Sequence, residues 1–309
     1  DSHGEREQSS SLPPGGGEGA ERACRVFHAD LYGLREQKYG WLNAHELERT
    51  GWRELKPGTP FYLFVPREEA LAASYNGFAA VTQLFPVSSV GIVTSRDEFV
   101  VEFDKEALKR RIRQFRDLNV PDQVLRQAFK LQDKPNWRLS EARANVRSDT
   151  DWEQKIVPCL YRPFDVRWLF YHPAVIERGR YEVMRHMLAG DNVALAVGRA
   201  GQVIGPEEWR IVFCTDHITE FNLYRRGGNC LFPLYLYPTG EQEDLFAHHE
   251  ASERRPNLNP KLIGALAQAY GREPTPEEIF QYVYAVLYTP SYRQRYAEFL
   301  RMDFPRIPF

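Results

Sequence analysis

A run of arginines and large aromatic residues, YRPFDVRWLFYHPAVIERGRYEVMRHML, extends from Tyr161 to Leu188. Guanidinium groups beside flat rings are suited to holding phosphates and to contacting base edges. A structural alternative is that the aromatic rings fill a core while the arginines extend into water. The composition of the run leaves both interpretations open.

The spacing within this run predicts where its polar side chains lie. Strand alternation in VRWLFY places Arg167 and Tyr171 on one face. Farther along, a glycine allows a turn between Arg178 and Arg180, and a short helix follows that begins near Tyr181. Backbone donors at a helix N-terminus favour an anion, so these two arginines beside them indicate a phosphate or base-edge contact.

A second basic element is the predicted helix DKEALKRRIRQFRDL. Asp104 can cap it, and Leu108, Ile112 and Phe115 fall on one stripe that is expected to be buried. The basic residues on the remaining faces have two interpretations: they contact the phosphate backbone of a nucleic acid, or they are an ordinary solvated surface. These basic residues are Lys105, Lys109, Arg110, Arg111, Arg113 and Arg116.

Motifs for catalysis are missing from this sequence. It contains no HExxH, GxSxG or CxxC pattern, and VGRAGQVIG does not have the spacing of a phosphate-binding glycine loop. The Asn-Pro-Pro-aromatic motif of amino-group methyltransferases is also missing. We therefore predict no catalytic, cofactor-binding or metal-ligating residue in this chain.

The composition is that of a folded, water-soluble protein. Hydrophobic residues make up 43% of the 309 residues, and 40 Lys and Arg nearly balance 42 Asp and Glu. A formal net charge of -2 means that any basic surface must be local. With neither a membrane-spanning apolar run nor a signal peptide in the sequence, we expect a cytoplasmic protein with no membrane partner.

The order of the elements predicts an α+β fold, a mixed sheet with a helical C-terminal subdomain. We expect a flexible loop or tail over 1–22, a first α+β unit over 23–155, a second β-rich unit over 156–245 and a helical unit over 246–309. Two strands are predicted around a turn at Ser95–Asp97. Thr275, followed by Pro and Glu278, forms a capping-box pattern that starts a helix.

Several segments together resemble one known family, the type ISP restriction-modification enzymes. The resemblance lies in their C-terminal target-recognition region and covers almost everything from Cys24 to Phe309. Its segments are RVFHADLYGLREQKYGWL, PFYLFVP, FPVSSVGIVTSRDEF, YRPFDVRWLFYHP, ERGRYEVMRHML, NVALAVGR, VFCTDHITE, LFPLYLYP and PEEIFQYVYAVLYTPSYRQRYAEFLRMDFPRIPF.

The resemblance implies a domain that selects the double-stranded DNA target of an adenine-N6 methyltransferase. That methyltransferase would be part of the same bacterial or archaeal polypeptide, with a helicase-like ATPase and a nuclease. S-adenosylmethionine, ATP and Mg are then implied for the parent enzyme, and none for this chain. The first α+β unit is expected to follow the methyltransferase core.

Combined with the residue pattern, the resemblance implies specific DNA contacts. Residues of the shared motif, Arg162, Phe164 and Asp165, are expected to maintain the scaffold, with an Arg162–Asp165 ion pair as one possibility. Base reading is expected mainly from three segments, 177–181, 199–208 and 224–229, here named the reading loops. The base-reading candidates are Arg167, Tyr171, Arg178, Arg180, Tyr181, Arg199, Gln202, Arg225 and Arg226. The phosphate candidates are Lys109, Arg110, Arg113 and Arg185.

Two other functions stay open at the level of the sequence. The chain could couple the methyltransferase to the motor with little direct DNA contact. It could also be a stand-alone enzyme of a type that its motifs do not reveal.

Overall fold

The computed structural model describes residues 24–58, 62, 64, 66, 69–199, 201–203, 207–224, 227–238 and 254–309, without the side chains of residues 69 and 70. The chain divides into two compact units, Asp1–Arg67 and Glu68–Phe309. The flexible segment predicted over 1–22 lies outside the described residues. The other predicted domain boundaries stay predictions.

The first unit is a small α/β element. Strand β1 (Val26–His28) pairs antiparallel with β2 (Arg53–Leu55), and α1 (Arg35–Ala44) and a 3₁₀ turn (Leu47–Arg49) lie between them in the chain. No residue of α1 is buried. The described large apolar side chains of this unit that remain exposed are Phe27, Tyr32, Leu34, Tyr39, Leu42, Leu47, Trp52, Tyr62 and Phe64.

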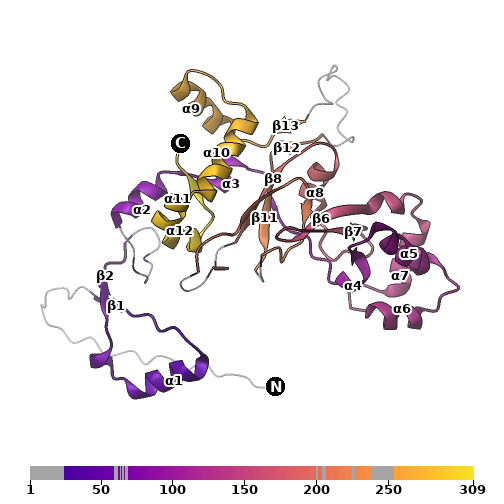
Figure 1. The fold of residues 1–309 in the computed structure, drawn as a ribbon, viewed down its shortest axis with the longest axis horizontal. Helices are drawn as coiled ribbons and strands as arrows, with labels where there is room; N and C mark the ends of the chain where they lie inside the picture. Colours follow the sequence, from indigo (N-terminus) through magenta and orange to yellow (C-terminus); the bar gives the residue numbers. More distant parts are fainter. Residues whose placement is uncertain are drawn as a thin grey trace, which may run out of the picture. The chain divides into compact units, whose positions relative to one another are not determined.

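The second unit contains the remaining elements (Figure 1). Its helices are α2 (Glu69–Asn76), α3 (Val81–Leu84), α4 (Asp97–Val100), α5 (Lys105–Arg116), α6 (Asp122–Phe129), α7 (Leu139–Ser148), a 3₁₀ turn (Trp152–Lys155), α8 (Tyr181–Leu188), α9 (Pro260–Tyr270), α10 (Pro276–Tyr288), α11 (Pro290–Arg295) and α12 (Ala297–Met302). Its strands are β3 (Ala79–Ala80), β4 (Ser89–Val90), β5 (Val101–Glu102), β6 (Ile156–Arg162), β7 (Asp165–Phe170), β8 (Ala194–Gly198), β9 (Val212–Thr215), β10 (Ile218–Thr219), β11 (Asn229–Pro233), β12 (Tyr235–Leu236), β13 (Arg255–Pro256) and β14 (Arg306–Ile307).

Two four-stranded sheets organise this unit. The first has the order β10-β6-β7-β5, with β10 parallel to β6 and the other pairs antiparallel. The second has the order β4-β11-β8-β9 and is antiparallel throughout. With the helices α9–α12 near the C-terminus, this arrangement confirms the predicted α+β fold with a mixed sheet.

The second sheet separates two hydrophobic cores. All five residues of β8 are buried, and strand alternation sends them to opposite sides. Ala194 and Ala196 belong to the core that also contains Phe115 and Phe170, whereas Leu195 and Val197 belong to the core of the C-terminal helices. Such two-sided burial explains why the sequence of β8 is apolar at every position.

Local sequence signals account for the helix starts. Asp104 Oδ1 accepts a hydrogen bond from Ala107 N (2.6 Å), and the predicted stripe of α5 is fully buried. Thr275 and Glu278 form the predicted capping box, with Glu278 N to Thr275 Oγ1 at 3.2 Å and Thr275 N to Glu278 Oε2 at 2.9 Å. These satisfied backbone donors fix where α5 and α10 begin.

The predicted pair of strands around Ser95–Asp97 is wrong in its second half. Asp97 begins the short helix α4, and strand pairing resumes only at Val101. The Thr94 hydroxyl donates a hydrogen bond to the Asp97 carboxylate, and Ser95 has a φ of 56°. A side-chain bond of this kind offers the backbone an alternative to a ladder, which favours a turn into a helix.

The buried ring of His186 on α8 is expected to make the stability of the protein depend on pH. Its ring is buried, and Nδ1 accepts a hydrogen bond from Tyr237 N (3.0 Å). Burial, helped by Arg185 and Arg255, lowers the pKa of His186 to about 4. The unfolded chain therefore binds a proton near pH 6.5 that the folded chain binds only near pH 4.

We expect the free energy of unfolding to fall by up to about 3 kcal/mol from this residue as the pH drops through that window. His186→Gln, which keeps an acceptor for Tyr237 N, should flatten this part of the profile. Urea unfolding at pH 7, 6 and 5 measures it. Equal slopes for both proteins would contradict the prediction.

Within the described parts of the chain, no helix has both the length and the apolar character needed to cross a membrane.

Candidate nucleic-acid interface

The β6–β7 hairpin engages the half-buried side chain of Arg167. Its guanidinium donates to both carboxylate oxygens of Asp165 at 2.8–3.1 Å and lies between the rings of Phe103 (4.1 Å) and Tyr161 (4.3 Å). The Asp165 contact raises the pKa of Arg167. The residue that the sequence offers as a base reader is therefore already engaged in the fold.

Arg162, on the other strand of the hairpin, pairs with a distant carboxylate. Its Nη1 donates to Glu220 Oε2 (2.6 Å), and Glu220 is only 4% exposed. Burial raises the pKa of Glu220, and the positive charge of Arg162 opposes this. The Arg162–Asp165 ion pair considered from the sequence does not form, because Asp165 binds Arg167 instead.

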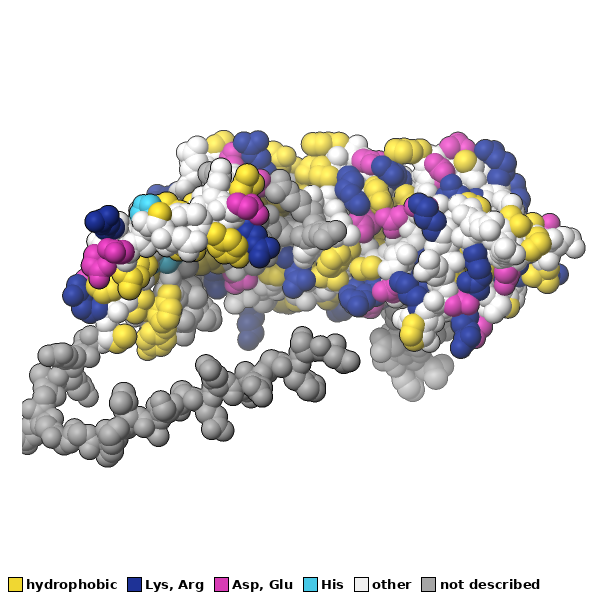
Figure 2. Space-filling model, turned by 90° about the horizontal axis from the view of Figure 1, so that it is seen from below, with side chains coloured by type: hydrophobic (Ala, Val, Ile, Leu, Met, Phe, Trp, Pro, Cys, Tyr) yellow, Lys and Arg dark blue, Asp and Glu magenta, His cyan; other side chains and the backbone are white. Residues whose placement is uncertain are grey.

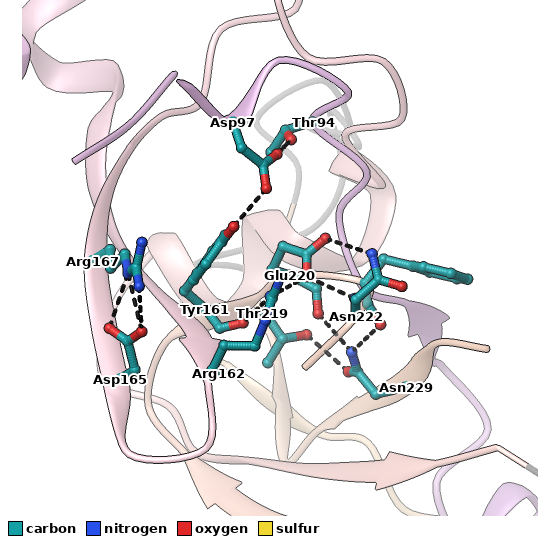
Figure 3. A network of polar contacts seen from close by, with 11 residues as sticks. Thr94, Asp97, Tyr161, Arg162, Asp165, Arg167, Thr219, Glu220, Asn222 and Asn229 are labelled. Carbon is teal, nitrogen blue, oxygen red and sulfur yellow. Dashed lines mark hydrogen bonds and ion pairs between the residues drawn. The ribbon is translucent and has the colours of Figure 1, made fainter. Parts of the chain in front are cut away.

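Glu220 is the centre of a polar cluster that we name the Glu220 network, made of Arg162, Thr219, Glu220, Asn222 and Asn229 (Figure 3). Asn222 N donates to Glu220 Oε2 (2.7 Å). Asn229 Nδ2 donates to the backbone oxygen of Glu220 (2.7 Å), and Asn229 Oδ1 accepts from the Thr219 hydroxyl (3.1 Å). Thr219, Glu220 and Asn229 are buried, whereas Arg162 and Asn222 are half-buried, so hydrogen bonds within the network replace those that the buried groups would make to water.

The segment 91–93 connects this network to the predicted reading loops. Gly91 N donates to Asn229 O, and Val93 exchanges two backbone hydrogen bonds with Arg178 (3.0 and 3.1 Å). A Cβ on Gly91 would lie 2.7 Å from Glu220 O, so only glycine fits here. Asn229 also pairs with Gly198, the residue before Arg199. The structure thus brings the described ends of all three loops around the Glu220 network.

The loop 177–181 presents two arginines in different ways. Arg178 is exposed, and its guanidinium makes no hydrogen bond or ion pair with any described residue. Arg180 caps α8 with a φ of 57°, and its Nε is buried without a hydrogen-bond partner among the described atoms. Arg178 is therefore free to contact a ligand, whereas Arg180 is partly enclosed.

The two tyrosines of this region support the loop. Tyr171 is buried, and its hydroxyl donates to the backbone oxygen of Gly179. Tyr181 packs on Tyr171 with ring centroids 4.7 Å apart, and burial raises the pKa of Tyr181 to about 12. A Cβ at Gly179 would lie 2.1 Å from the Tyr181 ring, so the ring requires glycine there. Tyr171 thus faces the interior and shares no exposed surface with Arg167.

The two base-reading candidates of the loop after β8, Arg199 and Gln202, differ in exposure. Arg199 is exposed, and its guanidinium makes no hydrogen bond or ion pair to another described residue. Gln202 is buried, and its Oε1 accepts a hydrogen bond from Arg199 N (2.8 Å). Beside this loop lies a cavity of about 320 Å³ whose lining includes Pro163, Gln202, Glu208, Arg210 and Tyr224. Arg225 and Arg226 lie outside the described residues.

Most of the phosphate candidates have partners. Lys109 lies 3.1 Å from Glu106 and 3.4 Å from Glu153, and Arg113 lies 2.9 Å from Glu153. Glu106, helped by Glu153, raises the pKa of Lys109, and Arg113, helped by Lys109, lowers the pKa of Glu153. Arg185 donates to Tyr237 O (3.3 Å). Arg110 is exposed and makes no ion pair within the described chain. Opposite charges interleave in the same way on the face in Figure 2, where no continuous basic band crosses the described residues.

Sequence reasoning missed the residues that organise this site. Glu220 and Asn229 lie 58 and 67 positions after Arg162 in the chain, and no spacing rule connects them. The only signal is the polar TDHITE stretch among apolar strands, which does not identify a partner. Within the described residues, no three His, Cys, Asp or Glu side chains are grouped so that they could hold a metal ion.

Comparisons with solved structures find longer chains, two of which are type ISP restriction-modification enzymes. The structure called "cryoEM structure DrdV-DNA complex" has a TM-score of 0.63 and 25% identity, and the match covers 89% of this chain and 27% of that one. A nuclease-deletion mutant of the type ISP enzyme LlaGI, in complex with a DNA substrate mimic, has a TM-score of 0.60, 21% identity and coverage of 92% and 22%. The ATP-dependent type ISP enzyme LlaBIII, bound to DNA, has a TM-score of 0.59, 19% identity and coverage of 83% and 17%.

This chain therefore spans about a quarter of the length of DrdV. No curated protein matches its sequence. A family model described as the "Type ISP C-terminal specificity domain" matches residues 83–309, which is most of the chain and includes the Glu220 network. The chain belongs to the type ISP C-terminal specificity domain family.

Proposed function

We propose that this chain recognises the DNA target of a type ISP restriction-modification enzyme. The family match over residues 83–309 carries the proposal, and it bears out the function predicted from the sequence. DrdV, LlaGI and LlaBIII, which share the fold, are described as complexes with DNA or a DNA mimic. A domain that defines specificity acts by contacting base edges, phosphates or both.

The free cations of the described chain are the best candidates for these contacts. Arg178 and Arg199 lie in two of the loops whose described ends meet at the Glu220 network, and both side chains are exposed. A bidentate Arg–guanine contact contributes about 1–3 kcal/mol of discrimination. We assign phosphate contact to Arg110, since Glu106 and Glu153 contact Lys109 and Arg113 and offset their charges. Arg167, Arg162, Gln202 and Tyr171 then act indirectly, by holding the loops.

We further propose that the catalytic parts belong to the rest of the polypeptide. Adenine-N6 methylation and restriction, with S-adenosylmethionine, ATP and Mg, would be carried out there, in the cytoplasm of a bacterium or archaeon. The many exposed apolar side chains of the unit Asp1–Arg67 support a neighbouring domain, because exposed apolar surface marks interaction sites where it is contiguous. A methyltransferase domain of the same polypeptide is the partner that we propose.

Selection of bound duplexes from a random-sequence library tests the function. The full-length protein should enrich one sequence, and its affinity for that duplex should fall steeply with salt, with a slope of about -0.9 per phosphate contact in log units. Binding without sequence enrichment would favour the coupling role and contradict target recognition. Saturable binding of S-adenosylmethionine to this chain alone would instead favour a stand-alone enzyme.

A further inference from the structure

Phe164 occupies an unusual position at the tip of the β6–β7 hairpin. Its side chain is 88% exposed, the largest exposed fraction among the large apolar side chains of the described residues. Its φ is 62°, in the left-handed region. Proline followed by a positive φ is the pattern of a type II turn, whose second central position favours Gly or Asn. Neither burial nor backbone preference therefore accounts for an aromatic residue here, and the scaffold role that the resemblance implies for Phe164 does not explain the exposed ring.

Ion pairs on both strands of the hairpin lie beneath this ring. Arg162 is fixed to the buried carboxylate of Glu220, and Arg167 is fixed to Asp165, on the two strands that enter and leave the turn (Figure 3). The ring of Phe164 meets Phe213 edge-on at a centroid distance of 4.9 Å. A side chain held in this way loses little conformational entropy when it binds a partner.

The surroundings of Phe164 favour DNA over another protein as the partner. Charged residues flank the turn on both strands, namely Arg162, whose side chain is 36% exposed, and Asp165. Centres of protein–protein interfaces are depleted in charged residues. By contrast, proteins that kink DNA insert a single apolar side chain between two base pairs while neighbouring polar groups contact the backbone.

We propose that Phe164 is an unstacking wedge, whose ring enters the duplex between two adjacent base pairs at the target site. The wedge rests on the proposed function of target recognition. It adds a contribution to specificity from how easily a base-pair step opens, because pyrimidine–purine steps unstack more readily than others. A wedge role also explains why an aromatic residue occupies a turn position where the backbone favours glycine.

Phe164→Gly separates this role from a structural one. Glycine relieves the left-handed backbone and removes the ring, so the variant should unfold at the same temperature or a higher one. Its affinity for the selected duplex should nevertheless fall about tenfold. With 2-aminopurine at successive positions, the wild-type full-length protein should raise the fluorescence at one step, and the variant should not. Phe164→Leu should restore part of that signal.

Leu118→Ala serves as the control, since Leu118 is 60% exposed in the loop between α5 and α6 and has no proposed role. Its affinity and fluorescence should match the wild type. Unchanged affinity and fluorescence for Phe164→Gly would overturn the wedge alone. A lower unfolding temperature with the fluorescence retained would also overturn it, and would assign Phe164 to contact with another domain. Failure of the wild-type protein to bind duplex DNA would contradict the proposed function itself.

Discussion

Reversing the charge of Arg178 and Arg199 together is expected to weaken binding of the full-length protein to its selected duplex by about a hundredfold or more. Each arginine can supply a contact of about 1–3 kcal/mol, and a glutamate in its place adds repulsion from the phosphates. Neither guanidinium has a hydrogen-bond or ion-pair partner among the described residues. The double variant should therefore keep its fold.

The control is Arg295→Glu, which makes the same substitution at one exposed position at the end of α11 and therefore half of the double variant's change in charge. Fluorescence anisotropy at two salt concentrations measures both proteins. The double variant should also show a shallower salt dependence, whereas Arg295→Glu should change affinity less than about threefold. Equal losses in the two proteins would indicate only long-range electrostatics and would contradict the assigned contacts.

Removing Glu220 is expected to produce the largest loss of stability. Its carboxylate accepts hydrogen bonds from Arg162 Nη1 and Asn222 N in a buried setting. Glu220→Ala leaves both donors without this partner, and we expect a loss of about 2–4 kcal/mol in the free energy of unfolding. The estimate stays below the highest values for buried pairs because Arg162 can still reach water.

Two further variants make this measurement specific. Glu220→Gln keeps an oxygen for Asn222 N and should lose only about 1–2 kcal/mol. Glu208→Gln breaks an Arg–Glu contact of the same length, 2.6 Å, on the surface and should lose less than about 1 kcal/mol. Urea unfolding compares all three. A similar small loss for Glu220→Ala and Glu208→Gln would show that the Glu220 network does not hold the loops.

Much of the fold could be predicted because its signals are local. Asp104, Thr275 and Glu278 lie within three residues of the backbone donors that they satisfy, so sequence spacing alone determines their caps. The apolar strands of the second sheet were equally recognisable from their runs of buried residues. The helix after Val93 could not be recognised from the sequence. There the Thr94 hydroxyl donates a hydrogen bond to the Asp97 carboxylate, and a helix begins at Asp97 where the residue pattern predicts a strand.

The candidate site was predicted only in part. The loop 177–181 could be identified from its glycine between two arginines, since a backbone turn is a local property. Which arginines remain free could not, because Arg113 and Arg162 are engaged by carboxylates 40 and 58 positions away in the chain. Strand alternation predicted that Tyr171 shares a face with Arg167, and it did not predict that the Tyr171 hydroxyl donates to the backbone oxygen of Gly179 in the interior.

The sequence by itself determined the α+β class, the helix caps and the resemblance to type ISP enzymes, because residue spacing and short motifs record all three. Only the tertiary structure decided which arginines pair with a carboxylate and which remain exposed. Arg162 and Arg167 hold the hairpin, Arg178 and Arg199 remain exposed, and Phe164 projects from the turn. The physical reason is that a salt bridge depends on distance in space, which strand pairing and packing set and sequence separation does not.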